Sequence, residues 1–305
     1  MVVQIAVRFS SFQGSVVSLV EDQGELTEKR ERLLSLLASM EDVAVAFSGG
    51  VDSAVVAQAA HLALGSRAVA VTGCSPSLAR GELEAARQLA DQIGIRHEVI
   101  ETEEFGNDSY TRNAPDRCYH CKDELYGRME ILIGRISQGI LVNGANTDDL
   151  GDYRPGMRAA GEHQVRSPLA ECGICKQDVR NLALHWDLPV WDKPAMPCLA
   201  SRVAYGEEVT PDRLVMIDRA EILLREHGFQ TVRVRYHSGD LARLEVPLDD
   251  FSRLLQSDFH RRLSDELKQI GFKFVTLDLE GFRSGSLNAL VPVELMLPTG
   301  DDAPE

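Results

Sequence analysis

The stretch Val43-Ala44-Val45-Ala46-Phe47-Ser48-Gly49-Gly50-Val51-Asp52-Ser53 decides the fold of this chain. Residues 43–47 are a short apolar run, typical of a buried strand, and the pattern Val55, Val56, Ala59, Leu62 that follows is helical. Glycines let a loop turn sharply between a strand and a helix, and the N–H groups of the helix's first turn are free to bind an anion. Residues 48–53 therefore predict a pyrophosphate-binding loop.

This loop differs from a Walker loop, which has the spacing G-x-x-x-x-G-K-[ST] and contains a lysine. The alternative is an ordinary strand-to-helix turn, but paired glycines, two serines and an aspartate coincide where a phosphate loop needs them. The pattern resembles the PP-loop ATP pyrophosphatases, which split ATP into AMP and pyrophosphate. The resemblance implies that Mg²⁺ is placed with the help of Asp52 and that ATP is bound by Ser48, Gly49, Gly50, Asp52 and Ser53.

Strands and helices alternate over the first two thirds of the chain, which predicts an α/β fold with a parallel sheet. The predicted strands cover residues 43–47, 67–72, 96–100 and 139–143, and the predicted helices cover residues 54–63, 82–93 and 122–136. Ligands bind at the carboxyl ends of such strands. We therefore expect Ser75, Gly144 and Asn146, which follow strands, to meet residues 48–53 in one ATP site.

The pattern changes near residue 207 to an α–β–β–α–β unit, which predicts a small α+β domain. Its expected elements are helices over residues 211–227 and 249–270 and strands over residues 231–235, 242–246 and 274–279. We expect an N-terminal extension over residues 1–26, a candidate for disorder, the PP-loop domain over residues 27–206 and the small domain over residues 207–292. Residues 293–305 form an acidic tail.

The overall composition is that of a globular protein of 305 residues, with 44% hydrophobic and 26% charged residues. A formal charge of −15 argues against nucleic acid as the main partner, because such binding depends on clustered Lys and Arg. The chain contains no apolar run of about 18 residues, the length that a membrane helix needs. We expect a cytoplasmic protein that does not bind membranes.

Six cysteines in a chain from a reducing compartment favour metal binding or catalysis over disulfides. Cys118 and Cys121 form one C-x-x-C pair, and Cys172 and Cys175 form another. We expect the second pair to be buried thiols at a helix start, and Cys74 to have no functional role.

Three further segments contain residue types that fit either a functional role or an ordinary structural role. Residues 146–156 concentrate carboxylates suited to Mg²⁺ or a ribose, or form a solvated loop with an Asp helix cap. Cys198, close to Arg202, is a candidate thiolate or a small buried side chain. Arg233 and Arg235 share one face of a strand, where they either bind a phosphate or lie exposed on an edge strand.

Together these segments resemble the LarE family of sulfur-transferring PP-loop enzymes. The resemblance extends over about residues 27–290 and rests on residues 48–53, 73–77, 117–122, 143–156, 167–169 and 198–206. The family adenylates carboxylates of pyridinium-3,5-biscarboxylic acid mononucleotide and replaces oxygen by sulfur, which builds the precursor of the nickel-pincer cofactor. The resemblance also implies a homo-oligomer, with a hexamer as one form.

The resemblance assigns the sulfur-donor position to Cys198. In single-cysteine members this residue forms a thioester, loses its sulfur and becomes dehydroalanine. Cys118 and Cys121 instead resemble the three-cysteine variants, in which Cys118, Cys121 and Cys198 hold a [4Fe–4S] cluster, and we favour the cluster. Cys172 and Cys175 do not belong to that pattern. The implied substrate-phosphate residues are Arg233 and Arg235, and Arg202 is a candidate for the same anion. Glu221 and Glu245 are weaker candidates for substrate binding.

Two rival functions remain open. PP-loop tRNA thiolation enzymes also use a C-x-x-C pair and a third cysteine, although the acidic charge of this chain weighs against tRNA. A non-catalytic nucleotide-binding or metal-sensing module would keep the loop without turnover.

Overall fold

A parallel sheet of four strands organises the larger domain in a computed structural model that describes residues 12–136, 139–150, 155–194 and 196–283. The strand order is β3-β2-β1-β4. The strands are β1 (Val43–Ala46), β2 (Ala68–Cys74), β3 (Arg96–Glu101) and β4 (Ile140–Val142). In the centre, Val43 of β1 pairs with Ala68 of β2 on one side and with Ile140 of β4 on the other. The predicted α/β fold is confirmed.

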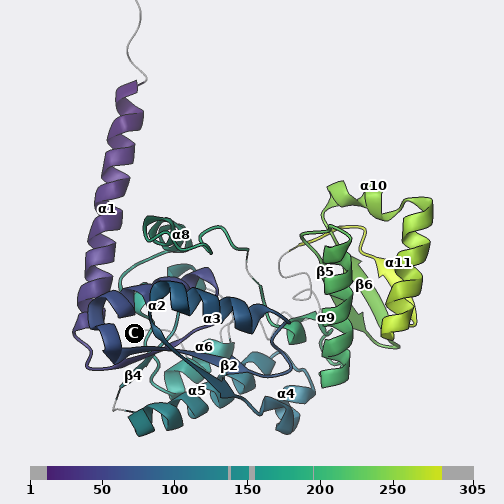
Figure 1. Ribbon diagram of the computed structural model, residues 1–305, viewed down its shortest axis with the longest axis horizontal. Coiled ribbons are helices and arrows are strands. Elements are labelled where there is room, and N and C mark those ends of the chain that lie inside the picture. The colour runs from purple at the N-terminus through teal and green to yellow at the C-terminus, as the bar shows by residue number, and fades with distance from the viewer. Residues whose placement is uncertain (1–11, 137–138, 151–154, 195, 284–305) are drawn as a thin grey trace, which may run out of the picture.

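Helices cover both faces of this sheet, because side chains of a strand alternate between the faces. Val43 and Val45 pack into a core with the first three helices and with α7 and α8, whereas Ala44 packs with α5 and α6 (Figure 1). The helices of this domain are α1 (Phe12–Ala38), α2 (Val51–Leu64), α3 (Glu82–Ile93), α4 (Asp108–Thr111), α5 (Arg117–Ile136), α6 (Pro155–Glu162), α7 (Pro168–Glu171) and α8 (Lys176–His185).

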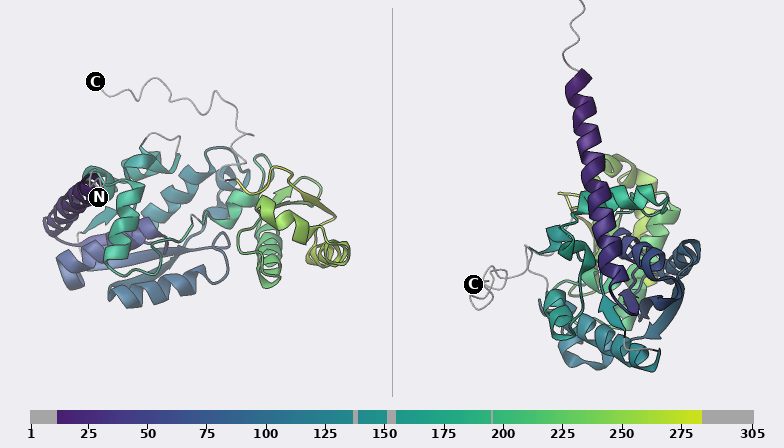
Figure 2. Two further views of the ribbon diagram at one scale, coloured as in Figure 1. Left: turned by 90° about the horizontal axis from the view of Figure 1, so that it is seen from above. Right: turned by 90° about the vertical axis from the view of Figure 1, so that its left-hand side faces the viewer.

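The smaller domain is a three-stranded sheet in the order β5-β6-β7, with its long helices packed on it (Figure 2). β5 and β6 are antiparallel, and β6 and β7 are parallel. Its elements are α9 (Pro211–Glu226), β5 (Arg233–His237), β6 (Leu241–Glu245), α10 (Phe251–Leu254), α11 (Ser257–Ile270) and β7 (Phe274–Leu277). This arrangement matches the expected α–β–β–α–β unit.

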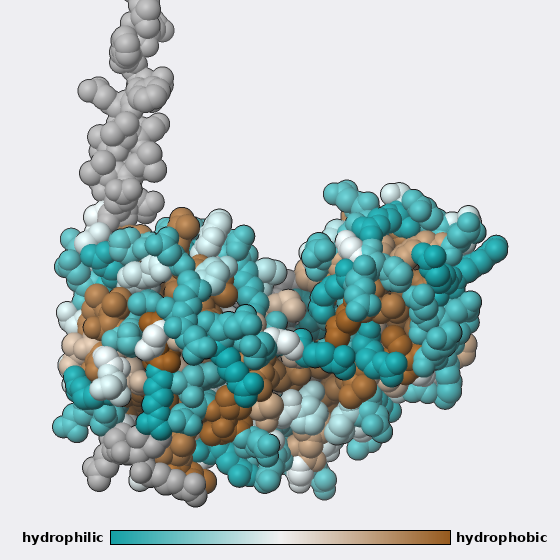
Figure 3. Space-filling view, in the orientation of Figure 1, coloured by the Kyte–Doolittle hydropathy of each residue, from teal (hydrophilic) through white to brown (hydrophobic). Residues whose placement is uncertain are grey.

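The two domains share a largely hydrophilic surface that is hollowed between them (Figure 3). The core of the smaller domain includes Leu199, Ala200 and Val203, upstream of the expected boundary at residue 207. Val203 forms a bridge with Tyr236 of β5. The segment that follows Cys198 therefore connects the two domains and packs into the core of the smaller one. None of the helices in the described residues is long and apolar enough to cross a membrane.

Three expected elements differ in the structure. Residues 1–26 are the candidate for disorder, but residues 12–26 are helical and form part of α1. Residues 1–11 and the acidic tail lie outside the described residues. α5 begins at Arg117, so Cys118 and Cys121 lie in its first turns. The single helix expected over residues 249–270 is split between α10 and α11, because Gln256 has an extended backbone (φ −56°, ψ 134°).

Short 3₁₀ turns join several of these elements. They are Gly65–Arg67, Glu104–Gly106, Thr147–Asp149, Leu199–Arg202 and Leu248–Asp250.

Candidate active site

The predicted phosphate loop lies at the carboxyl end of β1, where the chain connections leave the sheet in opposite directions. β1 is followed along the chain by β2 on one side, and β4 lies on its other side. Such a switch in strand order is where α/β sheets bind ligands.

The loop itself is shaped by glycine and by internal hydrogen bonds. Gly49 has a positive φ of +71°, and a Cβ there would lie 3.3 Å from the Cβ of Ala86. Ser53 Oγ donates to the carbonyl of Gly50 at 3.0 Å and accepts from the N–H of Ser48 at 3.2 Å. These contacts hold the loop against the first turn of α2, whose positive dipole end favours an anion.

The loop after β4 packs directly against the phosphate loop. A Cβ at Gly144 would lie 2.8 Å from the backbone nitrogen of Ser53, so only glycine allows this approach. Asn146 Nδ2 donates to Asp52 Oδ1 at 3.1 Å, while its Oδ1 accepts from the N–H of Asp148 at 3.0 Å. The structure thus brings Gly144 and Asn146 to the phosphate loop, as expected.

Lys176 is a residue of this site that the sequence reasoning missed. Its Nζ lies 2.5 Å from Asp52 Oδ2, and its backbone N–H donates to Asp148 Oδ2 at 3.1 Å. Lys176 begins α8, 124 positions along the chain from Asp52. The sequence signal available was its place directly after the second C-x-x-C pair, and that pair points to cysteine chemistry rather than to a lysine.

The segment of Cys198 is fixed to the loop after β2. The N–H of Leu199 donates to the carbonyl of Ser77 at 2.9 Å, and the N–H of Ser77 donates to Ser75 Oγ at 3.2 Å. The hydroxyls of Ser77 and Tyr110 lie 2.5 Å apart. Ser75 and Cys198 therefore meet through Ser77, and the exposed thiol of Cys198 lies near the carboxyl end of the sheet.

Cys118 and Cys121 face the same region as Cys198. Burial and then the Cys198 thiol raise the pKa of Cys121 to about 12. Burial alone would lower the pKa of Lys122, but Tyr126 and the thiols of Cys121, Cys118 and Cys198 raise it. All three thiols therefore act electrostatically on the Lys122 ammonium.

Three cysteines would leave one position of a [4Fe–4S] cluster open. Lys122 and Arg117 place positive charge near the three cysteines, which favours thiolates, whereas burial favours the protonated thiol at Cys121. Burial alone would lower the pKa of Arg117, but the charges of Cys198 and Cys118 raise it overall. In the part of the chain that the structure describes, no three His, Cys, Asp or Glu side chains are already close enough together to hold a metal ion.

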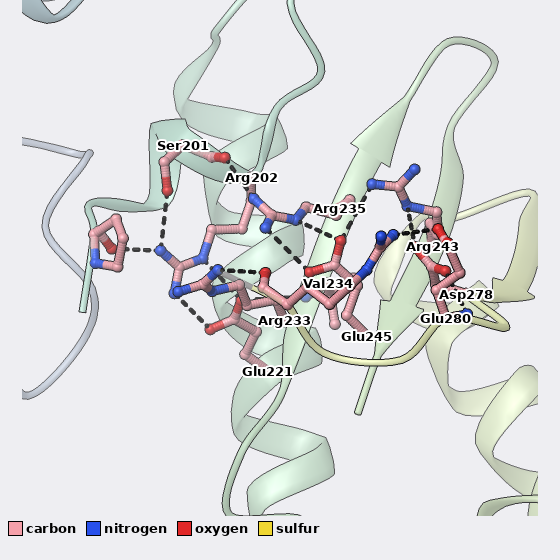
Figure 4. A network of polar contacts seen from close by, with 12 residues as sticks. Ser201, Arg202, Glu221, Arg233, Val234, Arg235, Arg243, Glu245, Asp278 and Glu280 are labelled. Carbon is pink, nitrogen blue, oxygen red and sulfur yellow. Dashed lines mark hydrogen bonds and ion pairs between the residues drawn. The ribbon is translucent and has the colours of Figure 1, made fainter. Parts of the chain in front are cut away.

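A buried network of arginines and glutamates lies on the other side of the Cys198 segment (Figure 4). Arg202 Nε donates to Glu221 Oε1 at 3.0 Å, and its Nη1 donates to the carbonyl of Cys198 at 3.1 Å. Arg235 Nε donates to Glu245 Oε1 at 3.1 Å, and its Nη1 donates to the carbonyl of Ser201 at 2.8 Å. Both arginines thereby shape the turn that carries Cys198.

These arginines are not the exposed edge-strand residues of the alternative interpretation. Arg202, Arg233 and Arg235 are between 2% and 6% exposed, although β5 is an edge strand. Burial, followed by Arg235 and Arg202, lowers the pKa of Arg233, whose guanidinium stacks on Phe282. The positive charge gathered there favours an anion.

The cysteines of the second C-x-x-C pair contribute to packing and to helix capping. Cys172 is buried, and its carbonyl accepts a hydrogen bond from Arg32 of α1 at 3.3 Å. Cys175 is the N-cap of α8 and shares a capping box with Asp178. The expectation of two buried thiols at a helix start therefore holds in part, because Cys172 is buried but ends α7, and Cys175 begins α8 but is only partly buried.

Comparisons with known proteins find similar sequences over most of this chain. The asparagine synthase family model matches residues 34–141. An uncharacterised protein of Synechocystis is 45% identical over 87% of this chain and 99% of its own length. The pyridinium-3,5-bisthiocarboxylic acid mononucleotide synthase of Lactiplantibacillus plantarum is 36% identical over 86% of this chain and 95% of its own length. The tRNA-specific 2-thiouridylase of Rickettsia africae is 25% identical over 53% of this chain and 54% of its own length.

Proposed function

The chain belongs to the LarE family of ATP-dependent PP-loop sulfurtransferases, and on that premise we propose that it converts carboxylates of pyridinium-3,5-biscarboxylic acid mononucleotide into thiocarboxylates. The reaction passes through an acyl adenylate. The observation that carries this proposal is the position of Cys198, whose segment is bonded to the loop after β2 on one side and to Arg202 on the other. A thiol in that position reaches both an activated carboxylate and the nucleotide that activates it.

The first half of the reaction uses the phosphate loop. A substrate carboxylate oxygen attacks the α-phosphorus of ATP, the bond from that phosphorus to the bridging oxygen breaks, and pyrophosphate leaves with the electron pair. The first-turn N–H groups of α2 stabilise the leaving charge. Asp52, oriented by Asn146, is the carboxylate that would hold Mg²⁺ beside the phosphates.

The buried arginine network positions the substrate. A mononucleotide carries a phosphate, and guanidinium groups bind phosphate through paired N–H donors. Arg233 offers its charge on the face that it shares with Arg235, while Glu221 and Glu245 keep Arg202 and Arg235 oriented. Because Arg202 also contacts the carbonyl of Cys198, substrate binding and thiol placement are coupled through one side chain.

The second half of the reaction transfers sulfur. In the sacrificial route, the Cys198 sulfur attacks the acyl carbon and AMP leaves, which gives a thioester. Loss of the Cys198 α-proton and cleavage of its Cβ–S bond then release the thiocarboxylate and leave dehydroalanine. A [4Fe–4S] cluster held by Cys118, Cys121 and Cys198 would supply a replaceable sulfide instead. We favour the second route, because the chain has cysteines at all three positions of the three-cysteine variants that it resembles.

The test is a reconstituted reaction with ATP, Mg²⁺, sulfide and the biscarboxylate mononucleotide. We expect AMP, pyrophosphate and thiocarboxylate to form together. Cys198→Ala should abolish the thiocarboxylate while pyrophosphate still forms, and Cys172→Ala should behave as the wild type. Absence of thiocarboxylate from wild-type protein supplied with sulfide would refute the proposal, and absence of pyrophosphate as well would favour a non-catalytic nucleotide-binding module.

A tRNA thiolation activity is the second candidate, favoured by the similarity to the 2-thiouridylase. Phosphate contacts release counterions, so a genuine tRNA complex would weaken steeply as salt increases. A gel-shift titration with tRNA at low and moderate salt separates this candidate, and the charge of −15 leads us to expect no specific shift.

A further inference from the structure

We infer that Asp218 of α9 is a positioning residue for the nucleoside part of ATP, although it belongs to the smaller domain. It acts through the backbone of Arg80, in the loop after β2, and the inference rests on the proposed ATP site. This role extends the ATP site across the boundary between the two domains.

The loop after β2 lies beside the phosphate loop. β1 and β2 are parallel neighbours, with Ala46 paired to Val71, so their carboxyl ends meet at one edge of the sheet. With the phosphates of ATP at residues 48–53, the nucleoside extends over the carboxyl end of a neighbouring strand. On the side of β4, Gly144 packs closely against the loop, which leaves the side of β2 for the nucleoside. Residues 75–81 are therefore the surface that receives it.

Asp218 holds the end of this loop through a main-chain contact. Its Oδ1 accepts from the backbone N–H of Arg80 at 3.2 Å, and its Oδ2 lies 3.6 Å from Arg80 Nε. Asp218 is 7% exposed, whereas the side chain of Arg80 is 69% exposed. A hydrogen bond to a buried carboxylate is strong, but an ion pair with so exposed an arginine contributes little. The bond from the N–H is thus the contact that fixes the loop.

The smaller domain holds the same loop at a second point. The carbonyl of Ser77 accepts from the N–H of Leu199 at 2.9 Å, and Leu199 packs in the core of the smaller domain. Within the loop, the N–H of Leu78 donates to the carbonyl of Ser75 at 3.1 Å. The shape of residues 75–80 therefore depends on contacts with the smaller domain.

The helix α9 connects this loop to the buried arginine network. Asp218 and Glu221 are three positions apart, which places their side chains on one face of the helix. Glu221 is 1% exposed and accepts from Arg202 Nε at 3.0 Å, so it orients an arginine of the proposed substrate site. One helix thereby fixes both the nucleoside loop and the substrate arginine, and it sets the spacing between ATP and the carboxylate that ATP activates.

The test measures binding of α,β-methylene-ATP and of inorganic pyrophosphate to the whole protein by calorimetry with Mg²⁺. Asp218→Leu removes the acceptor. We expect it to weaken binding of the nucleotide analogue about tenfold or more, because a hydrogen bond to a charged group is lost, and to leave pyrophosphate binding unchanged. Pyrophosphate has no nucleoside, so retained pyrophosphate binding also establishes that the variant is folded. Unchanged affinity for the analogue, or equal losses for both ligands, would overturn the inference.

Two further variants separate the main-chain contact from the ion pair. Asp218→Asn keeps an oxygen that accepts from the N–H of Arg80 and should retain most of the affinity for the analogue. Arg80→Gln keeps the N–H itself and should change this affinity by less than about twofold. A loss in Arg80→Gln as large as that in Asp218→Leu would overturn the main-chain role. Asp212→Leu, which replaces an exposed aspartate of the same helix, is the matched control and should bind both ligands as the wild type does.

The binding assay uses neither the biscarboxylate substrate nor a sulfur donor, so its result is independent of sulfur transfer. Weak binding of the analogue by Asp218→Leu, with a wild type that makes no thiocarboxylate, would retain the inference and refute the proposed function. Unchanged binding of the analogue by Asp218→Leu, with an active wild type, would do the reverse.

Discussion

Arg117 Nη1 donates a hydrogen bond to the carbonyl of Ala200 at 2.8 Å, and so joins the helix of Cys118 and Cys121 to the turn that follows Cys198. The guanidinium is 4% exposed and also bonds to Asn113 Oδ1. A single buried cation thus sets the spacing between the two cysteine-bearing segments.

Replacing Arg117 by Met should uncouple sulfur transfer from adenylation. The carbonyl of Ala200 and the amide of Asn113 would lose a charged donor, which costs about 2–3 kcal/mol in the free energy of unfolding. We expect pyrophosphate formation to continue while thiocarboxylate formation falls at least about tenfold. Urea unfolding and product analysis measure both. Arg112→Gln, whose side chain is 61% exposed, is the control, and equal losses of both products in Arg117→Met would contradict the prediction.

The metal content of anaerobically purified protein should reveal the sulfur source. We expect about four iron and four acid-labile sulfide atoms per chain, lost in Cys118→Ala and kept in Cys172→Ala. Cys172 is a fair comparison because it is buried in the core beneath α1 and α2. Negligible iron in folded, ATP-binding protein would contradict the cluster, and dehydroalanine at position 198 would then appear by mass spectrometry after one turnover.

The Glu221 carboxylate should be among the most costly single side chains to remove. It is 1% exposed and accepts from Arg202 at 3.0 Å, Arg225 at 2.8 Å and the N–H of Val234 at 3.2 Å. Glu221→Gln leaves Arg202 buried without its countercharge, which costs about 3–5 kcal/mol in the free energy of unfolding.

Arg225→Gln tests the same network from its exposed side. The Arg225 side chain is 33% exposed, so we expect a loss of at most about 1 kcal/mol. Denaturant unfolding measures the free energy of unfolding of Glu221→Gln and Arg225→Gln. Similar losses in the two variants would show that burial of the side chain does not determine the loss of stability.

The conformation of the loop over residues 48–53 was predictable because its signal is local. A strand, paired glycines and a helix lie within about twenty consecutive residues, and their geometry follows from backbone chemistry alone. The carboxyl-end rule then placed Gly144 and Asn146 correctly, since parallel strands end at one edge.

Contacts made by residues that are distant in the chain could not be predicted from such a local signal. Lys176 reaches Asp52 across 124 positions, and a lysine at the start of a helix has no distinctive pattern. Strand alternation put Arg233 and Arg235 on one face, but it could not reveal their burial, which depends on Phe282 and on the turn after Cys198.

His163 should make stability depend on pH near neutrality. Its Nε2 lies 3.0 Å from Asp123 Oδ1 and its Nδ1 lies 2.9 Å from Glu130 Oε1, and only the protonated ring can donate to both. Burial alone would lower the pKa of His163, but these two hydrogen bonds raise it overall.

A raised pKa in the folded state stabilises the fold below the unfolded pKa of about 6.5, and this stabilisation is lost as pH rises through the folded pKa. We therefore expect the thermal midpoint of the wild type to exceed that of His163→Gln at pH 6, with the difference shrinking towards pH 9. Calorimetric scans across this range provide the measurement. His260→Gln is the control, because it removes an exposed ring that is bonded to the carbonyl of Gln256 rather than to carboxylates. A difference for His163→Gln that stays constant with pH would mean that the His163 ring is not protonated in the fold.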